Sequence, residues 1–289
     1  MILGTRSNRI SMAITNELLK RMSASYLSES VELKIISLAS EVDGDGLFPM
    51  QKAGDFGILE DMLRSGKIDV IALGVGEIPL DRSIWSEVVA VLPRGPVEDI
   101  LVSSVPLERM RPGSVIGVSS ARQKSLMSNL RPDLCVKDFR ETVNSRLDIG
   151  RGLDAFIVSR AGIELLRIDC PFFILDPTEF VPEPGQGATA VMCRTDSRYH
   201  KLLKDFDDQD TRICVESERF LLESTNKDDS APIGIWVKKG QDDIRIHAIV
   251  LDDLGMESFC LDRSIDLQCL DEGLDAVLKE LKYAWELVR

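Results

Sequence analysis

The spacing of apolar residues in the first third of the chain alternates between two periods. Short apolar runs are typical of buried strands, and apolar residues three or four positions apart are typical of helices packed on a sheet. Strands are expected at 2–3, 31–38 and 70–73, and helices at 10–22 and 56–63. Gly66 is expected to end the second helix. This strand-helix-strand-helix-strand order predicts a doubly wound α/β domain.

The same pattern continues in the middle of the chain. Further strands are expected at 88–92, 100–102, 114–118, around Val136 and at 155–158. The segment Pro93-Arg94-Gly95-Pro96 interrupts the series, as expected of a crossing point between domains. A second α/β unit is therefore predicted after it.

The last third of the chain has a different order of elements. A helix at 214–223 is followed by strands at 233–237, 244–250 and 257–261. One face of a final helix carries an apolar stripe, formed by Leu274, Val277, Leu278, Leu281, Trp285 and Val288. The stripe is interpreted as core packing of a small α+β domain.

Composition narrows the class of protein. The net charge of −13 over 289 residues opposes binding to nucleic acid or anionic membranes. No run approaches the ~18 apolar residues of a membrane span, and a cytoplasmic protein is expected. The six cysteines include no C-x-x-C pair and only two histidines are present, so we expect reduced thiols and no metal site.

The strongest candidate for chemistry lies in the segment 69–79, D-V-I-A-L-G-V-G-E-I-P. Gly74 and Gly76 interrupt the apolar run and are expected to allow unusual backbone angles or close approaches. Glu77 then places a carboxylate just after a strand, where open α/β sheets bind their ligands. The alternative is that Glu77 is a solvated loop acid.

Arginines also follow the predicted strands. Arg6 lies after the first strand, where Ser7 or Asn8 can cap the next helix, and Arg122 follows a hydroxyl-bearing turn. Helix starts bind anions through free N–H groups, and guanidinium groups suit carboxylates. A cleft for a ligand with several carboxylates is one interpretation. Plain surface charge is the other.

The order of these segments resembles one family, hydroxymethylbilane synthase, also called porphobilinogen deaminase. The similar segments are Gly4-Thr5-Arg6, the run G-V-S-S-A-R-Q at 117–123, R-P-D-L at 131–134, R-E-T-V-N-S-R-L at 140–147, P-E-P-G-Q-G-A at 182–188 and Pro232-Ile233-Gly234. They occur in the family's order and span nearly the whole chain.

The resemblance implies an α/β protein of three domains. Two would be doubly wound domains similar to periplasmic binding proteins, and the third a small C-terminal α+β domain. The expected boundaries are 1–94 with a return segment at 184–204, then 95–183, then 205–289.

The resemblance also implies an activity. Family members are transferases of tetrapyrrole, porphyrin and haem biosynthesis that join four porphobilinogens head to tail and release ammonia. They work on a dipyrromethane cofactor and need no metal. Carried over by position, Glu77 would be the catalytic carboxylate. The groups binding substrate and cofactor carboxylates would be Arg6, Lys52, Ser119, Ser120, Arg122, Arg140 and Arg146. The implied partner is a small porphobilinogen-like polycarboxylate, and a monomer is expected.

Several positions depart from the family pattern. Glu77 replaces an aspartate, and Gly76 replaces a lysine. The cysteine that bears the cofactor is replaced by Asp229, which cannot form a thioether. Further replacements are Gln123 for an arginine, with Lys124 beside it, Glu141 for a glycine and Leu165 for an arginine.

These departures leave three hypotheses open. The first is a divergent synthase that holds its primer non-covalently or by an unusual bond. The second is a catalytically inactive homologue that binds or senses a small polycarboxylate or tetrapyrrole precursor. The third is a paralogue with another reaction centred on Glu77. Arginines that bind carboxylates are compatible with all three.

Overall fold

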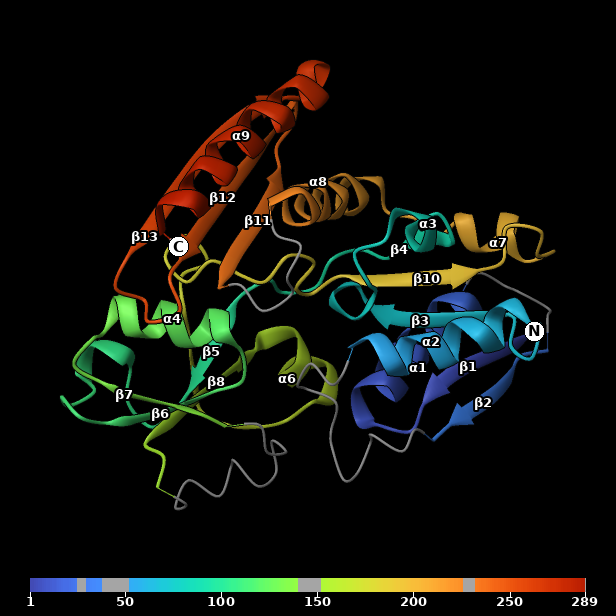
Figure 1. Ribbon diagram of the computed structural model, residues 1–289. Coiled ribbons are helices and arrows are strands. Elements are labelled where there is room, and N and C mark those ends of the chain that lie inside the picture. The colour runs from blue at the N-terminus through green and yellow to red at the C-terminus, as the bar shows by residue number, and fades with distance from the viewer. Residues whose placement is uncertain (25–29, 38–51, 140–151, 226–231, 289) are drawn as a thin grey trace. The chain divides into compact units, whose positions relative to one another are not determined.

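The computed structural model describes residues 1–24, 30–37, 52–139, 152–225 and 232–288 (Figure 1). The chain divides into two compact units, each described here by itself. Unit 1 comprises Met1–Gly95, Gly162–Ile168 and Gly187–Arg212, and unit 2 comprises Pro96–Ala161, Asp169–Gln186 and Ile213–Arg289.

Unit 1 is built on a five-stranded sheet with the strand order β2-β1-β3-β10-β4. Its strands are β1 (Ile2–Arg6), β2 (Glu32–Ile36), β3 (Val70–Gly74), β4 (Val88–Val91) and β10 (Thr189–Cys193). β1 runs parallel to β2 and β3, as the alternating pattern predicted. Apolar spacing did not predict the strand β10, which lies within the return segment 184–204 that the resemblance implied and runs antiparallel between β3 and β4. β3 therefore lies in a mixed sheet and not in a purely parallel one.

Helices cover the sheet of unit 1, and α1 contributes most to its core. The helices are α1 (Arg9–Ala24), α2 (Lys52–Arg64), the short α3 (Arg82–Trp85) and α7 (His200–Lys204). Ile10, Ile14, Leu18 and Met22 of α1 are buried in one cluster with residues of β1, β3, β4 and β10. Gly66 ends α2 with a φ of +71°, as predicted.

Unit 2 contains a second five-stranded sheet, with the strand order β7-β6-β8-β5-β9. The strands are β5 (Asp99–Val102), β6 (Val115–Val118), β7 (Cys135–Asp138), β8 (Ala155–Ser159) and β9 (Phe172–Ile174). β6 is parallel to β7 and β8, whereas β5 is antiparallel to β8 and β9. Helix α4 (Ala121–Leu130) follows β6 directly, whereas α6 (Arg160–Leu166) follows β8 and belongs to unit 1 from Gly162 onwards.

The C-terminal sheet consists of three antiparallel strands, β11 (Ile233–Lys239), β12 (Asp243–Leu251) and β13 (Ser258–Asp266). Helices α8 (Gln209–Thr225) and α9 (Leu270–Val288) contribute to the core on one of its faces. Leu274, Val277, Leu278 and Leu281 are buried there, which confirms the predicted packing stripe. On the opposite face Ile249 and Leu251 join the core of the second sheet.

The hairpin between β12 and β13 also contacts α4. Asn129 Nδ2 donates to the Gly255 carbonyl at 2.9 Å, and Ser125 Oγ donates to the Asp253 carbonyl at 3.2 Å. A Cβ on Gly255 would lie 2.2 Å from the Ser125 carbonyl oxygen, so only glycine fits this approach. The C-terminal sheet is thus packed firmly against the second sheet.

The fold is an α/β protein with two sheet-rich domains and a small C-terminal α+β domain, as predicted. The exact domain boundaries stay a prediction. Among the described helices, none combines the length and the apolar character that crossing a membrane requires.

Candidate active site

Glu77 lies in a short turn at the carboxyl end of β3. It is the last residue of the 3₁₀ turn η1 (Val75–Glu77), which follows Gly74 directly. Its Oε1 accepts a hydrogen bond from the Gly74 backbone N–H at 3.1 Å. The Val75 N–H donates to the Ala188 carbonyl at 3.0 Å, which attaches the turn to the chain entering β10. The backbone around Glu77 is thus fixed from two sides.

Arg6 is the ion-pair partner of Glu77. It is the last residue of β1, the parallel neighbour of β3, so both side chains lie at the same edge of the sheet. Arg6 Nη2 pairs with Glu77 Oε2, and Arg6 Nε donates to Ser11 Oγ at 3.1 Å. The Arg6 side chain is 11% exposed and that of Glu77 is 29% exposed, so part of the Glu77 side chain remains accessible to a small molecule.

Helix α1 supplies the Ser11 hydroxyl at a fixed position. Of the two predicted capping residues, Asn8 performs the role, because its Oδ1 accepts the Ser11 N–H at 2.8 Å. A buried hydrogen bond from Thr15 Oγ1 to Thr5 Oγ1, 2.9 Å long, joins α1 to β1. Sequence reasoning missed Ser11 because nothing in the local pattern relates it to Glu77.

The two glycines before Glu77 differ from expectation. Gly74 has a φ of −61°, and Gly76 has no left-handed backbone, so neither needs to be glycine for its conformation. A Cβ on Gly76 would meet no atom within 4 Å, and one on Gly74 would lie 3.2 Å from Glu77 Oε1. The prediction of unusual backbone angles is therefore wrong. A close approach exists only at Gly74, and it is to the Glu77 side chain.

Ser119 and Ser120 lie at the corresponding place in unit 2, where β6 leads into α4. Ser120 Oγ accepts the Gln123 N–H at 3.2 Å and caps α4. The Ser119 backbone N–H and its hydroxyl both donate to Gln123 Oε1 at 3.0 Å. The hydroxyl hydrogen of Ser119 is therefore directed to Gln123.

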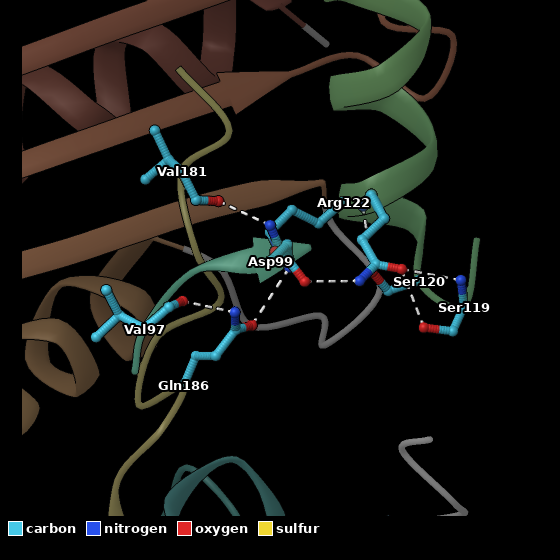
Figure 2. A network of polar contacts seen from close by, with 8 residues as sticks. Val97, Asp99, Ser119, Ser120, Arg122, Val181 and Gln186 are labelled. Carbon is cyan, nitrogen blue, oxygen red and sulfur yellow. Dashed lines mark hydrogen bonds and ion pairs between the residues drawn. The ribbon is translucent and has the colours of Figure 1, made fainter. Parts of the chain in front are cut away.

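Arg122 lies within a buried polar network (Figure 2). Its Nη2 donates to Asp99 Oδ2 at 2.7 Å, and its Nη1 donates to the Val181 carbonyl at 2.8 Å. Gln123 Nε2 donates to the other oxygen of Asp99 at 2.9 Å. The Arg122 side chain is 5% exposed and that of Asp99 is fully buried. Both charges are therefore compensated by partners inside the protein.

Gln186 extends this network towards the start of unit 2. Its Nε2 donates to the Val97 carbonyl at 2.7 Å, and its Oε1 lies 3.5 Å from Arg122 Nη2. Asp99, Gln123 and Gln186 were not predicted as a group. The only signals in the sequence are a charged residue in front of the apolar run 100–102 and the glutamine of the segment 182–188.

The remaining predicted site residues divide into two groups. Arg140, Arg146 and Asp229 lie outside the described residues, and Lys52 begins α2 with a side chain that is likewise outside them. Lys124 forms an exposed ion pair with Asp138 at 3.0 Å. Leu165 packs against the apolar core of unit 1.

The cysteines test whether the chain fits a primer held through a thioether. Cys193 and Cys214 are buried, and burial raises the pKa of the Cys193 thiol to about 11. The remaining cysteines lie in other elements or loops, at Cys135, Cys170, Cys260 and Cys269. No cysteine occurs between 215 and 259, so Asp229 has no thiol near it in the sequence. The residues present therefore do not fit a thioether at that segment.

Within the described ranges, no three His, Cys, Asp or Glu side chains are grouped as a metal ion would require.

Comparisons with known proteins identify the family. The family model described as "Porphobilinogen deaminase, dipyromethane cofactor binding domain" matches residues 1–201. The probable porphobilinogen deaminase of Thermoplasma acidophilum is 30% identical over 281 residues, covering 95% of this chain and 92% of the relative. That of Nitrosopumilus maritimus is 31% identical over 246 residues, covering 82% of this chain and 78% of the relative.

A solved structure was also compared with the chain. The methionine-binding protein MetQ superposes with a TM-score of 0.42 and 13% identity, covering 71% of this chain and 88% of MetQ. The family itself follows from the match over residues 1–201 and from relatives that align along most of their length. The chain belongs to the porphobilinogen deaminase family.

Proposed function

We propose that this protein is a divergent porphobilinogen deaminase that condenses porphobilinogen head to tail into hydroxymethylbilane. The observation that carries the proposal is the position of Glu77. Its carboxylate is held at the carboxyl end of β3 by a backbone N–H and a guanidinium group, and it remains partly exposed. This is the place where an open α/β sheet offers a group to a bound ligand.

The reaction needs a fixed negative charge. The C–N bond of the aminomethyl group breaks, its electron pair leaves with nitrogen, and ammonia departs after protonation. The remaining methylene carbon is part of a cationic azafulvene. A free pyrrole carbon attacks it, a C–C bond forms, and that carbon then loses its proton. Each bond formed thus releases one ammonia and needs no oxidant.

Glu77 is suited to two parts of this sequence. A carboxylate close to the pyrrole nitrogen stabilises the developing positive charge, because the protein has oriented it before the reaction begins. The same carboxylate can accept and return a proton. The extra methylene of glutamate relative to aspartate shifts the oxygens by about 1 Å, and the two contacts to Gly74 and Arg6 compensate by fixing them.

Binding of the acetate and propionate groups needs cations. We assign this role to Arg140, Arg146 and Lys52, with the hydroxyl group of Ser120. The Ser119 hydroxyl donates to Gln123 and is assigned a structural role. Arg122 is assigned a structural role instead, because its guanidinium is buried against Asp99 and the Val181 carbonyl.

The position that attaches the primer in the family is occupied by another residue in this chain. The family model describes a dipyrromethane-binding domain, and this chain has Asp229 at the attachment position. We propose that any primer is held without a thioether.

A second function has specific observations in its favour. Asp229 and Gly76 lack the thiol and the ammonium group that the family pattern places there. A binding module for a small polycarboxylate would need neither group.

Intact-mass spectrometry under denaturing conditions separates these proposals. The protein is measured before and after incubation with porphobilinogen, and the supernatant is examined for uroporphyrin. Uroporphyrin without a stable adduct is expected. An adduct that grows by pyrrole units would also support the enzyme but would contradict a non-covalent primer, and peptide mapping would then locate the attachment. Neither product from folded protein would contradict the enzyme and favour the binding module.

A further inference from the structure

The Arg6–Glu77 ion pair gives Arg6 a partner within the protein, and this changes the role that Arg6 can have at the site. We propose that Arg6 is a positioning residue for Glu77 and does not bind the carboxylates of the ligand. The proposal deepens the proposed function, because it concerns the same site, and it changes the role that the sequence predicted for Arg6.

Arg6 is held by two contacts within the protein. Arg6 Nη2 pairs with Glu77, and Arg6 Nε donates to Ser11 at 3.1 Å. A guanidinium group is planar and rigid, so contacts at Nε and Nη2 fix both its position and its orientation. The N–H groups at Nε and Nη2, which together could bind one ligand carboxylate, are thus directed to Ser11 and Glu77 instead.

The Glu77 carboxylate oxygen that pairs with Arg6 is buried. Glu77 Oε2 is shielded from solvent, so water does not balance its charge. Arg6 Nη2 forms the ion pair with this oxygen. Withdrawing Arg6 to bind a ligand would leave this oxygen buried and uncompensated, which is costly.

A series of polar contacts connects helix α1 to Arg6 and Glu77. Asn8 fixes the Ser11 backbone through a 2.8 Å hydrogen bond, Ser11 fixes Arg6, and Arg6 fixes Glu77. Ser11 is 2% exposed, so its hydroxyl is held by packing as well. The carboxylate is thus held through two routes, one from α1 through Ser11 and Arg6 and one from β3 through the Gly74 N–H.

The decisive experiment observes Arg6 directly and does not depend on turnover. The Arg6 Nε–H signal is recorded in ¹H–¹⁵N NMR spectra of the full chain and assigned by its loss in Arg6→Gln. We expect a slowly exchanging signal whose exchange accelerates at least about tenfold in Glu77→Gln and in Ser11→Ala. Arg9→Gln removes an exposed arginine at the start of helix α1, which also contains Ser11, and should leave the signal unchanged. An exchange rate that is the same in Glu77→Gln as in the wild type would overturn the proposal.

A kinetic arm rests on the proposed function. Arg6→Gln should lower kcat about 100-fold and change KM less than about threefold, because a displaced carboxylate affects the reacting state most. In the Glu77→Gln background the same change should have no further effect on porphobilinogen affinity. A tenfold weaker affinity in both backgrounds would show that Arg6 binds the ligand and would overturn the inference. If the wild type shows no turnover, the proposed function fails, while the NMR result still decides the role of Arg6.

Discussion

The two units each contain an arginine paired with a carboxylate near a strand end, and the pairs differ in burial. In unit 1 the Arg6–Glu77 pair is partly exposed, with 29% of the Glu77 side chain accessible. In unit 2 the Arg122–Asp99 pair is almost completely enclosed, with Asp99 fully buried. Both arginines follow a strand and lie beside a helix start, so the local sequence pattern is the same.

Burial, and not the local pattern, distinguishes the two pairs. A buried pair is difficult to separate, because removing one partner leaves a charge without compensation. A partly exposed carboxylate can meet a ligand while its partner keeps it in place. We therefore regard Glu77 as chemical and Asp99 as structural.

The largest expected effect concerns stability in unit 2. Asp99→Ala should lower the free energy of unfolding by about 3–5 kcal/mol, because Arg122 would remain buried without its partner. Urea unfolding followed by tryptophan fluorescence measures it, and Asp99→Asn, which keeps a hydrogen-bond acceptor, serves if the alanine variant does not fold. Asp138→Ala removes the exposed partner of Lys124 and should cost at most about 1 kcal/mol. Equal losses for the two sites would remove the contrast.

The next effect is catalytic. Glu77→Gln should lower kcat at least about 100-fold, since the neutral amide provides neither negative charge nor a base. Its free energy of unfolding should fall by about 1–3 kcal/mol, because the largely buried Arg6 would lose its charged partner while the amide keeps a hydrogen-bond acceptor. Glu17→Gln in α1 is the control for loss of a surface carboxylate. Undiminished turnover in Glu77→Gln would exclude Glu77 from the mechanism.

A smaller effect tests how Gln123 supports the buried pair. Gln123→Ala should cost about 1–3 kcal/mol, because Asp99 and the Ser119 backbone would each lose a buried hydrogen bond. Thermal unfolding against Lys124→Ala, its exposed neighbour in α4, measures the difference. A loss no greater than that of Lys124→Ala would show that the network does not depend on Gln123.

The smallest effect sharpens the description of the site. Gly76→Lys should change the free energy of unfolding by no more than about 0.5 kcal/mol, because a Cβ there meets no atom within 4 Å. A loss above about 2 kcal/mol would mean that the turn has less space than the structure gives it. The variant also adds a cation beside Glu77 for comparison with the wild type in turnover assays.

The sequence was sufficient for most elements and for part of the site. Apolar spacing located β1, β3, β6, β8 and the final helix, because each is built from local periodicity. It missed β10, because the position of this strand is set by its pairing with β3 and β4, which lie far earlier in the chain. Topology of this kind has no local signal.

The site shows the same division. Glu77 was predicted as the chemical centre because a carboxylate after an apolar run and two glycines is a local feature, and that role stays a prediction. The burial of Arg122 was not recognisable, because it depends on Asp99, Val181 and Gln186, which come from distant parts of the chain. The ion pair between Arg6 and Glu77 likewise joins residues that meet only when β1 and β3 pair.

Ammonia release from porphobilinogen tests the central claim most directly. The purified wild-type protein and Glu77→Gln are incubated with porphobilinogen, and ammonia and remaining substrate are measured together. The account predicts one ammonia for each porphobilinogen consumed by the wild type, and at least about 100 times slower release by Glu77→Gln. No ammonia from folded wild-type protein, or equal release by the two proteins, would contradict it.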